Sequence, residues 1–564
     1  MSRSVVAKSS KVAALFVSLS LGAVGVGAAV PAFAEGVAAV PYINPVAHLK
    51  GMPHERVCDP TARIHCNSVR LVDPATGSHH IKPLANGLPS GFGPSDLQKA
   101  YGINPAWGVG KTVAIVDLNG YPNAESDLAA YRTMYGLPPC TVASGCLTIK
   151  GSDGGAVPSG SDTKNWNGEA ALDMDMVSAI CPNCKIILLL GDSSDQSSLD
   201  EGQATAASLG ADVVSNSWSG TEDSGIASEE TQYYKTPAQT IGIFSAAGDD
   251  GYDSGGKSPQ YPSTSAYVTG VGGTALTVDA TTARGYTELP WGVDSKNGSA
   301  GSSCSKYITK PTYQSIIPTA TCKFRAASDI SAVGDPETGV AVYEAGGGTS
   351  TGDITNWGVY GGTSAATPIV SAIYAMTGNA KVGPSFPYAH TSAYWDVVGS
   401  SVNNNGSCTT ALCISGVGWD GETGIGTPNA AALAQLGGTS STPPPDMAVS
   451  PDMSTITPPV IIDMAKPVIV DMAVSDDLSQ PVGTGGNGGG TGSAGGTGSA
   501  GGTGSAGGTG SAGGTGAAGG GGSHGSGDTG CGCSLGGAPT ANGLLALPLA
   551  LALLGLAVYR RRRG

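Results

Sequence analysis

Apolar and helical stretches alternate between residues 111 and 247, and this alternation limits the possible folds more than any other feature of the sequence. Short apolar runs typical of buried strands cover residues 111–117, 185–190, 211–217 and 241–247. Stretches typical of helices lie between them, at 127–134, 169–180 and 198–209. The alternation predicts an α/β fold, a doubly wound parallel sheet with helices on both faces. Functional residues should then follow the carboxyl ends of the strands.

A serine lies between small residues in the stretch GGTSAATP at 361–368, and an apolar run follows it at 369–376. This pattern predicts a tight turn that leads into a helix, with Ser364 at the helix entrance. Free N–H groups and the helix dipole stabilise negative charge there, so the position suits a nucleophile. A serine that only caps the helix would fit the same place. Gly361 and Gly362 favour the nucleophile because they let the backbone approach a ligand. Pro368 lies early in the predicted helix, where a missing N–H costs least.

A serine nucleophile needs a base within hydrogen-bond reach. A subtilisin would use a histidine as this base, usually within a Gly-His-Gly-Thr stretch. Six of the seven histidines lie outside residues 91–438. The seventh, His390, has no such surroundings, so we interpret it as a loop residue. Glu169 and Asp173 are four residues apart and would share one face of a helix. Two carboxyls that close share a proton, because repulsion raises one pKa. Such a pair could take and return the Ser364 proton, although most acidic pairs on helices are merely solvated.

These motifs together resemble the sedolisins, the serine-carboxyl peptidases. Glu169 and Asp173, the turn SAAGDDG at 245–251, the stretches YPS at 261–263 and VTGVGGT at 268–274, and the Ser364 turn follow one another in the family's order. The resemblance covers about residues 90–438 and implies a subtilisin-like fold. It implies Ser364 as nucleophile, Glu169 as general base, Asp173 as the residue that orients the base, and Asp249 as the oxyanion partner. Asp249 could donate to an oxyanion only in its protonated form.

The resemblance also implies a substrate strand. The stretch 216–220 resembles the wall strand of the family, which pairs with an extended substrate backbone. The residues predicted to bind substrate are therefore Ser217, Trp218 and Gly220. Trp218 would fit a plain core position equally well.

One structural calcium ion is implied near the end of the same region. An all-oxygen shell of carboxylates and main-chain carbonyls suits Ca²⁺. The predicted ligands are the side chains of Asp396 and Asp420 and the carbonyls of Val397, Gly416 and Gly418.

Ten of the 12 cysteines fall into five close pairs, which are 58/66, 140/146, 181/184, 304/322 and 408/413. Close pairs in an exported chain predict local disulfides, although proximity is the basis for this pairing. The stretch CPNC at 181–184 would also suit a redox motif. The surrounding sequence has no thioredoxin-like character, so a structural bridge is favoured.

Composition changes along the chain predict six regions. Basic residues, an apolar run and an Ala-x-Ala ending indicate a signal peptide at 1–34. Residues 35–88 are predicted to be an N-terminal extension or short pro-segment, and 89–438 the peptidase domain. A Pro-Asp-Met-rich linker follows at 439–482, and a repeated Gly/Ser/Thr/Ala-rich linker at 483–530; neither can bury enough apolar surface to fold. Residues 531–564 combine Cys, an apolar run and four arginines, and resemble a bacterial sorting tail.

We therefore expect an exported, acid-favouring serine-carboxyl endopeptidase that acts on polypeptides. Its catalytic domain should be monomeric and held at the bacterial cell surface or outer membrane by a tail that contacts the membrane. The net charge of -15 argues against nucleic acid as a partner. The alternatives are a catalytically silent surface binding module on the same fold and a His-dependent subtilase. The large pro-domain of most sedolisins is absent, so the sequence does not predict how this enzyme stays silent before export.

Overall fold

The computed structural model describes residues 42–159, 166–192, 196–292, 298–345, 356–399 and 408–438. The predicted signal peptide, both linkers and the C-terminal tail lie outside these residues. Within the described ranges, every helix is too short or too polar to cross a membrane.

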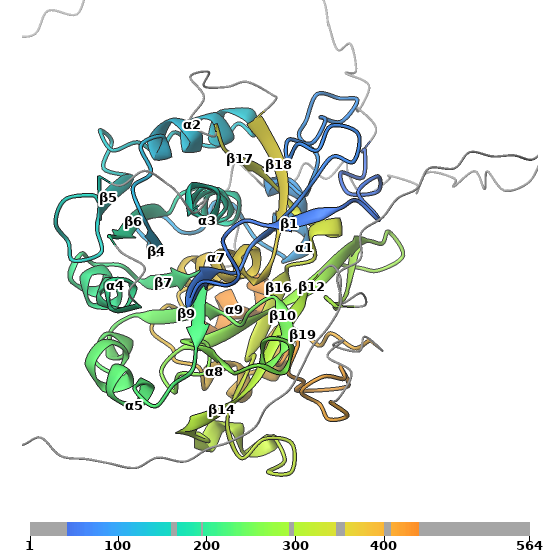
Figure 1. Ribbon diagram of the computed structural model, residues 1–564. Coiled ribbons are helices and arrows are strands. Elements are labelled where there is room, and N and C mark those ends of the chain that lie inside the picture. The colour runs from blue at the N-terminus through green and yellow to red at the C-terminus, as the bar shows by residue number, and fades with distance from the viewer. Residues whose placement is uncertain are drawn as a thin grey trace, which may run out of the picture. The chain divides into compact units, whose positions relative to one another are not determined.

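The helices and strands follow the chain in the order shown in Figure 1. The helices are α1 Pro94–Ala100, α2 Ala124–Met134, α3 Trp166–Ile180, α4 Gln196–Ser208, α5 Ile226–Glu229, α6 Asp253–Gly256, α7 Thr363–Met376, α8 Phe386–Ala389 and α9 Ala430–Leu436. The strands are β1 His54–Arg56, β2 Ile64–Cys66, β3 Val69–Leu71, β4 Thr112–Leu118, β5 Leu147–Gly151, β6 Lys185–Gly191, β7 Val213–Asn216, β8 Trp218–Thr221, β9 Gly242–Ala246, β10 Asp250–Tyr252, β11 Gln260–Tyr261, β12 Thr269–Val278, β13 Tyr286–Pro290, β14 Ser299–Thr309, β15 Phe324–Ala327, β16 Ile330–Val333, β17 Val340–Tyr343, β18 Trp357–Gly361, β19 Tyr394–Trp395 and β20 Thr427–Pro428.

The main sheet has the order β13-β12-β9-β7-β4-β6-β5, with β16 beside β12. All its neighbouring strands are parallel except β12 and β13. Residues 113–116 of β4 are all buried, which explains the continuous apolar run in the sequence. The predicted α/β fold with a parallel sheet is confirmed.

Helices cover both faces of this sheet. The side chain of Val116 in β4 faces α4, where a Cβ on Gly202 would lie 2.8 Å from it. The next residue, Asp117, interacts electrostatically with Glu169 and Asp173 of α3. Successive residues of a strand point to opposite faces, so α3 and α4 lie on opposite sides. Helix α7 packs beside α3.

Strands from before residue 89 are built into the sheets of the peptidase region. β1 and β3 form a sheet with β18 and β17, and β2 pairs with β8. In Figure 1 the blue N-terminal segment crosses the middle of the view in front of α7. The segment predicted to be an extension therefore lies against the strand that precedes Ser364.

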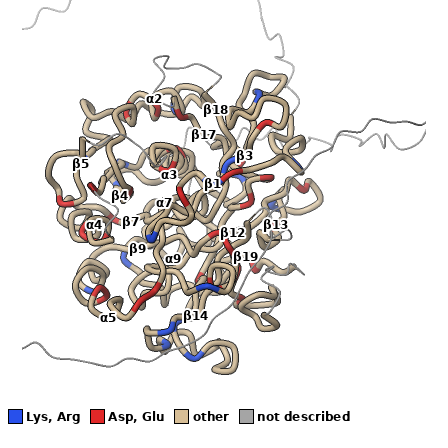
Figure 2. Tube along the Cα trace, viewed as in Figure 1, with Lys and Arg blue, Asp and Glu red and all other residues tan. Residues whose placement is uncertain are grey.

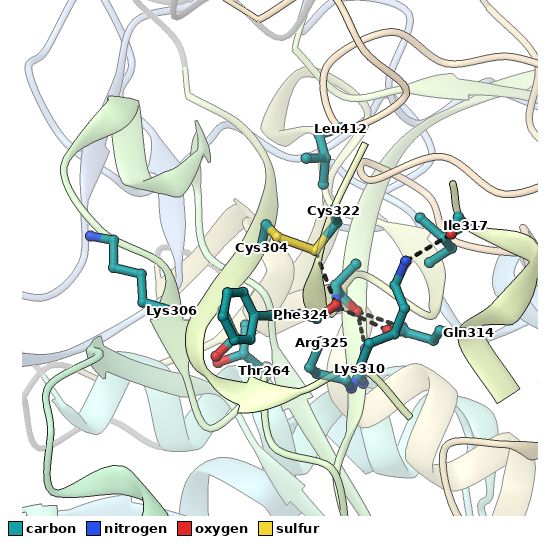
Figure 3. Close-up of a disulfide and its surroundings, with 12 residues drawn as sticks. Thr264, Cys304, Lys306, Lys310, Gln314, Ile317, Cys322, Phe324, Arg325 and Leu412 are labelled. Carbon is teal, nitrogen blue, oxygen red and sulfur yellow. Dashed lines mark hydrogen bonds between the residues drawn. A yellow bond between two sulfur atoms is a disulfide. The ribbon is translucent and has the colours of Figure 1, made fainter. Parts of the chain in front are cut away.

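All five predicted cysteine pairs form disulfides. Figure 3 shows the bridge from Cys304 in β14 to Cys322, just before β15. The Lys310 ammonium donates to the Ile317 carbonyl 2.7 Å away within the loop that this bridge closes. The CPNC stretch is a bridged turn at the end of α3, because the Cys184 N–H donates to the Cys181 carbonyl at 3.0 Å.

Charged residues of both signs are interspersed with neutral residues along the described chain (Figure 2). Several carboxyls depart from the usual surface location of charged residues. Asp117, Glu169, Asp173 and Asp249 are 2% exposed or less. Because buried carboxyls are unusual, these four direct attention to one region of the fold.

Candidate active site

Ser364 is the second residue of α7 and does not cap the helix. The capping position belongs to Gly362, whose φ of +95° favours glycine. The Ser364 hydroxyl is buried and donates to the Ser217 carbonyl at 2.9 Å. Its main-chain N–H, one of those left free at a helix start, donates to the Asn67 carbonyl at 2.8 Å.

Pro368 lies inside α7 and not in its first turn, so its predicted place was wrong. A proline at this point cannot donate to the carbonyl of Ser364, four residues earlier. The Ser217 hydroxyl lies 3.3 Å from that carbonyl oxygen instead. The proline therefore leaves the Ser364 carbonyl available to a neighbouring strand.

Glu169 and Asp173 lie one turn apart on α3, and both are fully buried. Burial, and then the charge of Asp117, raises the pKa of Glu169 well above its usual range, while hydrogen bonds from Ser364 and Ser68 lower it. Burial, Asp117 and Glu169 raise the pKa of Asp173 in the same way. The Ser217 hydroxyl donates to Asp173 at 2.7 Å, and the Ser68 hydroxyl donates to Glu169. The pair therefore retains protons at pH values where ordinary carboxyls have lost them.

Asp117 is the third member of this carboxyl cluster, and its sequence context predicted no catalytic role for it. It lies near the end of β4 and is fully buried. Neither of its carboxyl oxygens has a hydrogen-bond partner among the described residues. Burial raises its pKa to about 8. The available signal was a carboxyl at the end of an otherwise apolar strand.

Asp249 lies in the turn after β9, beside the start of α7. One of its carboxyl oxygens accepts the Thr363 N–H at 2.8 Å and the Thr363 hydroxyl at 2.9 Å. The other lies 3.0 Å from the Arg56 guanidinium. Burial raises the pKa of Asp249 to about 7, and Arg56 opposes the rise. If Gly362 carried a Cβ, that atom would lie 2.8 Å from this second carboxyl oxygen and 2.2 Å from the main-chain carbonyl oxygen of Asn67. Both oxygens therefore border the small space beside Gly362.

The predicted substrate-binding residues lie on or just before β8. The Ser217 carbonyl accepts the Ser364 hydroxyl and also the Asn67 N–H, the latter at 3.0 Å. The backbone of Gly220 pairs with Ile64 of β2 and Tyr261 of β11. The Trp218 side chain is fully buried, as its alternative core interpretation requires.

The one histidine within residues 91–438 is His390. His390 follows α8, and its ring lies 4.4 Å from that of Phe386, centroid to centroid. Over the described ranges, no histidine forms a hydrogen bond with Ser364.

The chain is similar in sequence to known peptidases. Residues 156–420 match the model of the subtilase family, Peptidase_S8. The chain is 29% identical over 401 residues to kumamolisin of Bacillus sp. (strain MN-32), covering 67% of this chain and 68% of kumamolisin. The chain is a sedolisin-like serine peptidase.

Two further proteins are similar to the chain. Tripeptidyl-peptidase sed1 of Aspergillus fumigatus is 28% identical over 274 residues, 40% of each chain. The structure of Pseudomonas sedolisin, a serine-carboxyl proteinase, matches with a TM-score of 0.50 and 24% identity over 61% of this chain and 97% of that one. The structural match supports the subtilisin-like fold.

The predicted calcium ligands of this peptidase lie on two loops that contact each other. The Gly418 N–H donates to Asp396 at 2.9 Å, and the Gly416 N–H donates to Asp420 at 3.3 Å. The Ser415 hydroxyl donates to the Val397 carbonyl at 2.8 Å. Asp420 is fully buried, which raises its pKa to about 7. A buried carboxyl among loop carbonyls is the kind of donor set that fits Ca²⁺.

Proposed function

We propose that this serine peptidase is an endopeptidase of the serine-carboxyl type that works best at acid pH. One observation carries the proposal. The start of α7 brings the Ser364 N–H and the Asp249 carboxyl to a single peptide carbonyl, that of Asn67, while Glu169 faces the next residue, Ser68. The residues proposed as nucleophile, oxyanion partner and base thus lie around one peptide bond.

Ser364 attacks the carbonyl carbon in this mechanism, and its proton moves to Glu169. Asp173, held by the Ser217 hydroxyl, keeps Glu169 in place and shares its proton. The carbonyl oxygen becomes an oxyanion that accepts from the Ser364 N–H and from protonated Asp249. Glu169 then returns the proton to the leaving amine, and water hydrolyses the acyl-enzyme by the same steps.

The acid preference follows from two proton requirements. The Glu169–Asp173 pair needs a shared proton, and Asp249 needs its own to act as a donor. Burial raises all three pKa values, so these protons persist above the usual carboxyl range. Both requirements fail as pH rises, which is opposite to the behaviour of a histidine base.

One calcium ion is part of the proposal. Asp396, Asp420 and the carbonyls of Val397, Gly416 and Gly418 would hold it. It would supply charge neutralisation for the buried Asp420 and would join the two loops, because a ligand that binds the native state stabilises it.

Export and surface attachment are also proposed. The supporting features are the signal-like residues 1–34, the sorting-like residues 531–564 and the five disulfides, which persist in oxidising compartments. The catalytic domain is proposed to act as a monomer on polypeptide substrates outside the cell.

The test is the variant Ser364→Ala, assayed with a fluorogenic peptide library at pH 4.5. We expect turnover to fall by about 10³-fold or more while the fold is kept, because the nucleophile is lost. Ser371→Ala is the matched control, since this buried hydroxyl lies in the same helix and donates to the Thr367 carbonyl at 2.7 Å. Near-normal turnover of pure Ser364→Ala would show that the proposed mechanism is wrong, and a wild-type chain inert on every peptide would favour the silent binding module.

A further inference from the structure

Residues 64–68, which begin with β2, lie across the proposed catalytic residues. β2 is antiparallel to β8, with Ile64 opposite Gly220, His65 opposite Ser219 and Cys66 opposite Trp218. Extended peptides are commonly held in this way, by adding a strand to a sheet edge. The segment thus occupies the place that β8 would offer to a polypeptide substrate.

The backbone of Asn67 makes the hydrogen bonds expected of the substrate residue that precedes a scissile bond. Its N–H donates to the Ser217 carbonyl at 3.0 Å, and its carbonyl accepts the Ser364 N–H at 2.8 Å. The Asp249 carboxyl faces the same carbonyl across Gly362. On the other side of the peptide bond, the Ser68 hydroxyl donates to Glu169. The bond between Asn67 and Ser68 therefore lies between the nucleophile and the base.

The side chain of Asn67 is 1% exposed and meets a polar environment. Its amide nitrogen donates to the Ser219 hydroxyl at 3.0 Å, and the same hydroxyl lies 3.1 Å from its amide oxygen. Ser219 is also 2.9 Å from the Gln260 side-chain oxygen. The Gln260 side-chain nitrogen donates to the Ser258 carbonyl at 3.2 Å, which directs the Gln260 oxygen toward Ser219.

This arrangement favours a carboxamide over other side chains. The single proton of the Ser219 hydroxyl can go to Gln260 while the hydroxyl oxygen accepts from the amide of Asn67. An ionised carboxylate in the same place would need that proton, and the buried Gln260 oxygen would lose its partner. An aliphatic side chain would offer no donor to Ser219. Leaving buried polar atoms unpaired is the basis of strong discrimination in such subsites.

We propose that this peptidase selects a carboxamide side chain in the residue before the scissile bond, that Ser219 and Gln260 read it, and that the Asn67–Ser68 bond of its own chain is one such substrate. The inference deepens the proposed function and rests on it. The cleavage consumes one water: Ser364 forms an ester with the Asn67 carbonyl, the C–N bond breaks, and Ser68 becomes a free amine. Water then releases Asn67 as a carboxylate.

The product would separate from the enzyme by loss of non-covalent contacts alone. Among the disulfides of the described residues, the one bridge in this segment joins Cys58 to Cys66, and both lie before Asn67. The piece would still be held by the pairing of β1 with β3 and by the ion pair between Arg56 and Asp249. Its departure would expose β8 and the nucleophile to other polypeptides.

The first experiment follows this bond in the full-length chain. The protein is purified at pH 8 and shifted to pH 4.5, and intact mass and N-terminal sequencing are followed over time. A new N-terminus at Ser68 is expected in the wild type and not in Ser364→Ala. Asn67→Leu should slow the cut by about ten-fold or more, because it replaces the amide with methyl groups on the same branched skeleton. Asn86→Leu is the control, since Asn86 is exposed in a turn.

The second experiment measures selectivity on added peptides that differ only in the residue before the cut. The wild type should show a kcat/KM ratio for Asn over Leu of about ten or more. The ratio should fall to about one in Ser219→Ala and stay high in Ser208→Ala, a change at an exposed hydroxyl on α4. A ratio near one in the wild type, an unchanged ratio in Ser219→Ala, or an intact Asn67–Ser68 bond in an active enzyme would overturn the inference. None of these results would disturb the serine-carboxyl mechanism, which the activity of Ser364→Ala tests separately.

Discussion

The variant Asp249→Asn gives the most direct test of how this peptidase stabilises its oxyanion. The carboxyl is buried beside the start of α7, and its pKa of about 7 places its loss of the proton near neutral pH. The wild type can donate to the oxyanion only below that value. An amide at the same place donates at every pH, so the variant removes one titration without changing the shape of the side chain.

The magnitude follows from the titration of a single group. With a pKa of about 7, the carboxyl is about nine-tenths protonated at pH 6 and about one-tenth at pH 8. This group alone should therefore lower kcat/KM by about ten-fold over that interval. In Asp249→Asn, the decrease in kcat/KM that comes from Asp249 should disappear. The decrease that comes from the Glu169–Asp173 pair should remain. The profile of the variant between pH 6 and 8 should be correspondingly flatter.

The assay is kcat/KM on an uncharged fluorogenic peptide from pH 3.5 to 8.5 at constant ionic strength. The matched control is Asp253→Asn, because the pKa of Asp253 is also raised, to about 6, while its carboxyl accepts the Cys304 N–H away from Ser364. The control should keep the wild-type profile. Superimposable profiles for Asp249→Asn and the wild type between pH 6 and 8 would refute the donor role of Asp249. A wild-type profile that climbs from pH 5 to a plateau at 8 would refute the carboxyl mechanism as a whole.

Three other predictions concern stability and location. Asp420→Ala should lower the melting temperature and abolish the rise on adding calcium, since binding to the native state stabilises it; an equal calcium response in variant and wild type would contradict the metal site. The pKa of Asp117 is raised to about 8 in the folded state, so loss of its proton should lower the free energy of unfolding as pH rises from about 4 to about 8. The denaturant midpoint of Asp117→Asn should therefore change less between pH 5 and 8 than that of the wild type. Equal changes in the two midpoints would contradict this. Deleting residues 531–564 should release active enzyme into the medium, and retention of the truncated protein on cells would show that another segment anchors it.

The sequence predicted the central sheet and the positions of the main acidic residues well, because both depend on local patterns. Buried parallel strands have continuous apolar runs, as in β4 and β6, and the spacing of Glu169 and Asp173 places them on one face of any helix. The five disulfides were predictable for the same reason, since each joins cysteines close in sequence.

The part that sequence reasoning missed depends on contacts between distant residues. β1, β2 and β3 have three residues each, too few for a periodic signal, and they are stabilised by partners far along the chain. Arg56 reaches Asp249 across 193 positions, and Asn67 meets Ser364 across an even longer separation. The cluster role of Asp117 was hidden likewise, because it arises only when α3 packs on β4. The predicted place of Pro368 was wrong because the sequence does not show at which residue the helix begins. α7 begins at Thr363, which puts Pro368 beyond its first turn.

The local character of the five disulfides has a consequence for how the chain matures. The bridged cysteines are separated by 8, 6, 3, 18 and 5 positions. In an unfolded chain, a short separation gives the correct partner a higher effective concentration than any distant cysteine. Each thiol therefore meets its native partner first, and oxidation can proceed in any order without wrong cross-links. A chain of this design could emerge unfolded into an oxidising compartment and close its loops with little need for an isomerase.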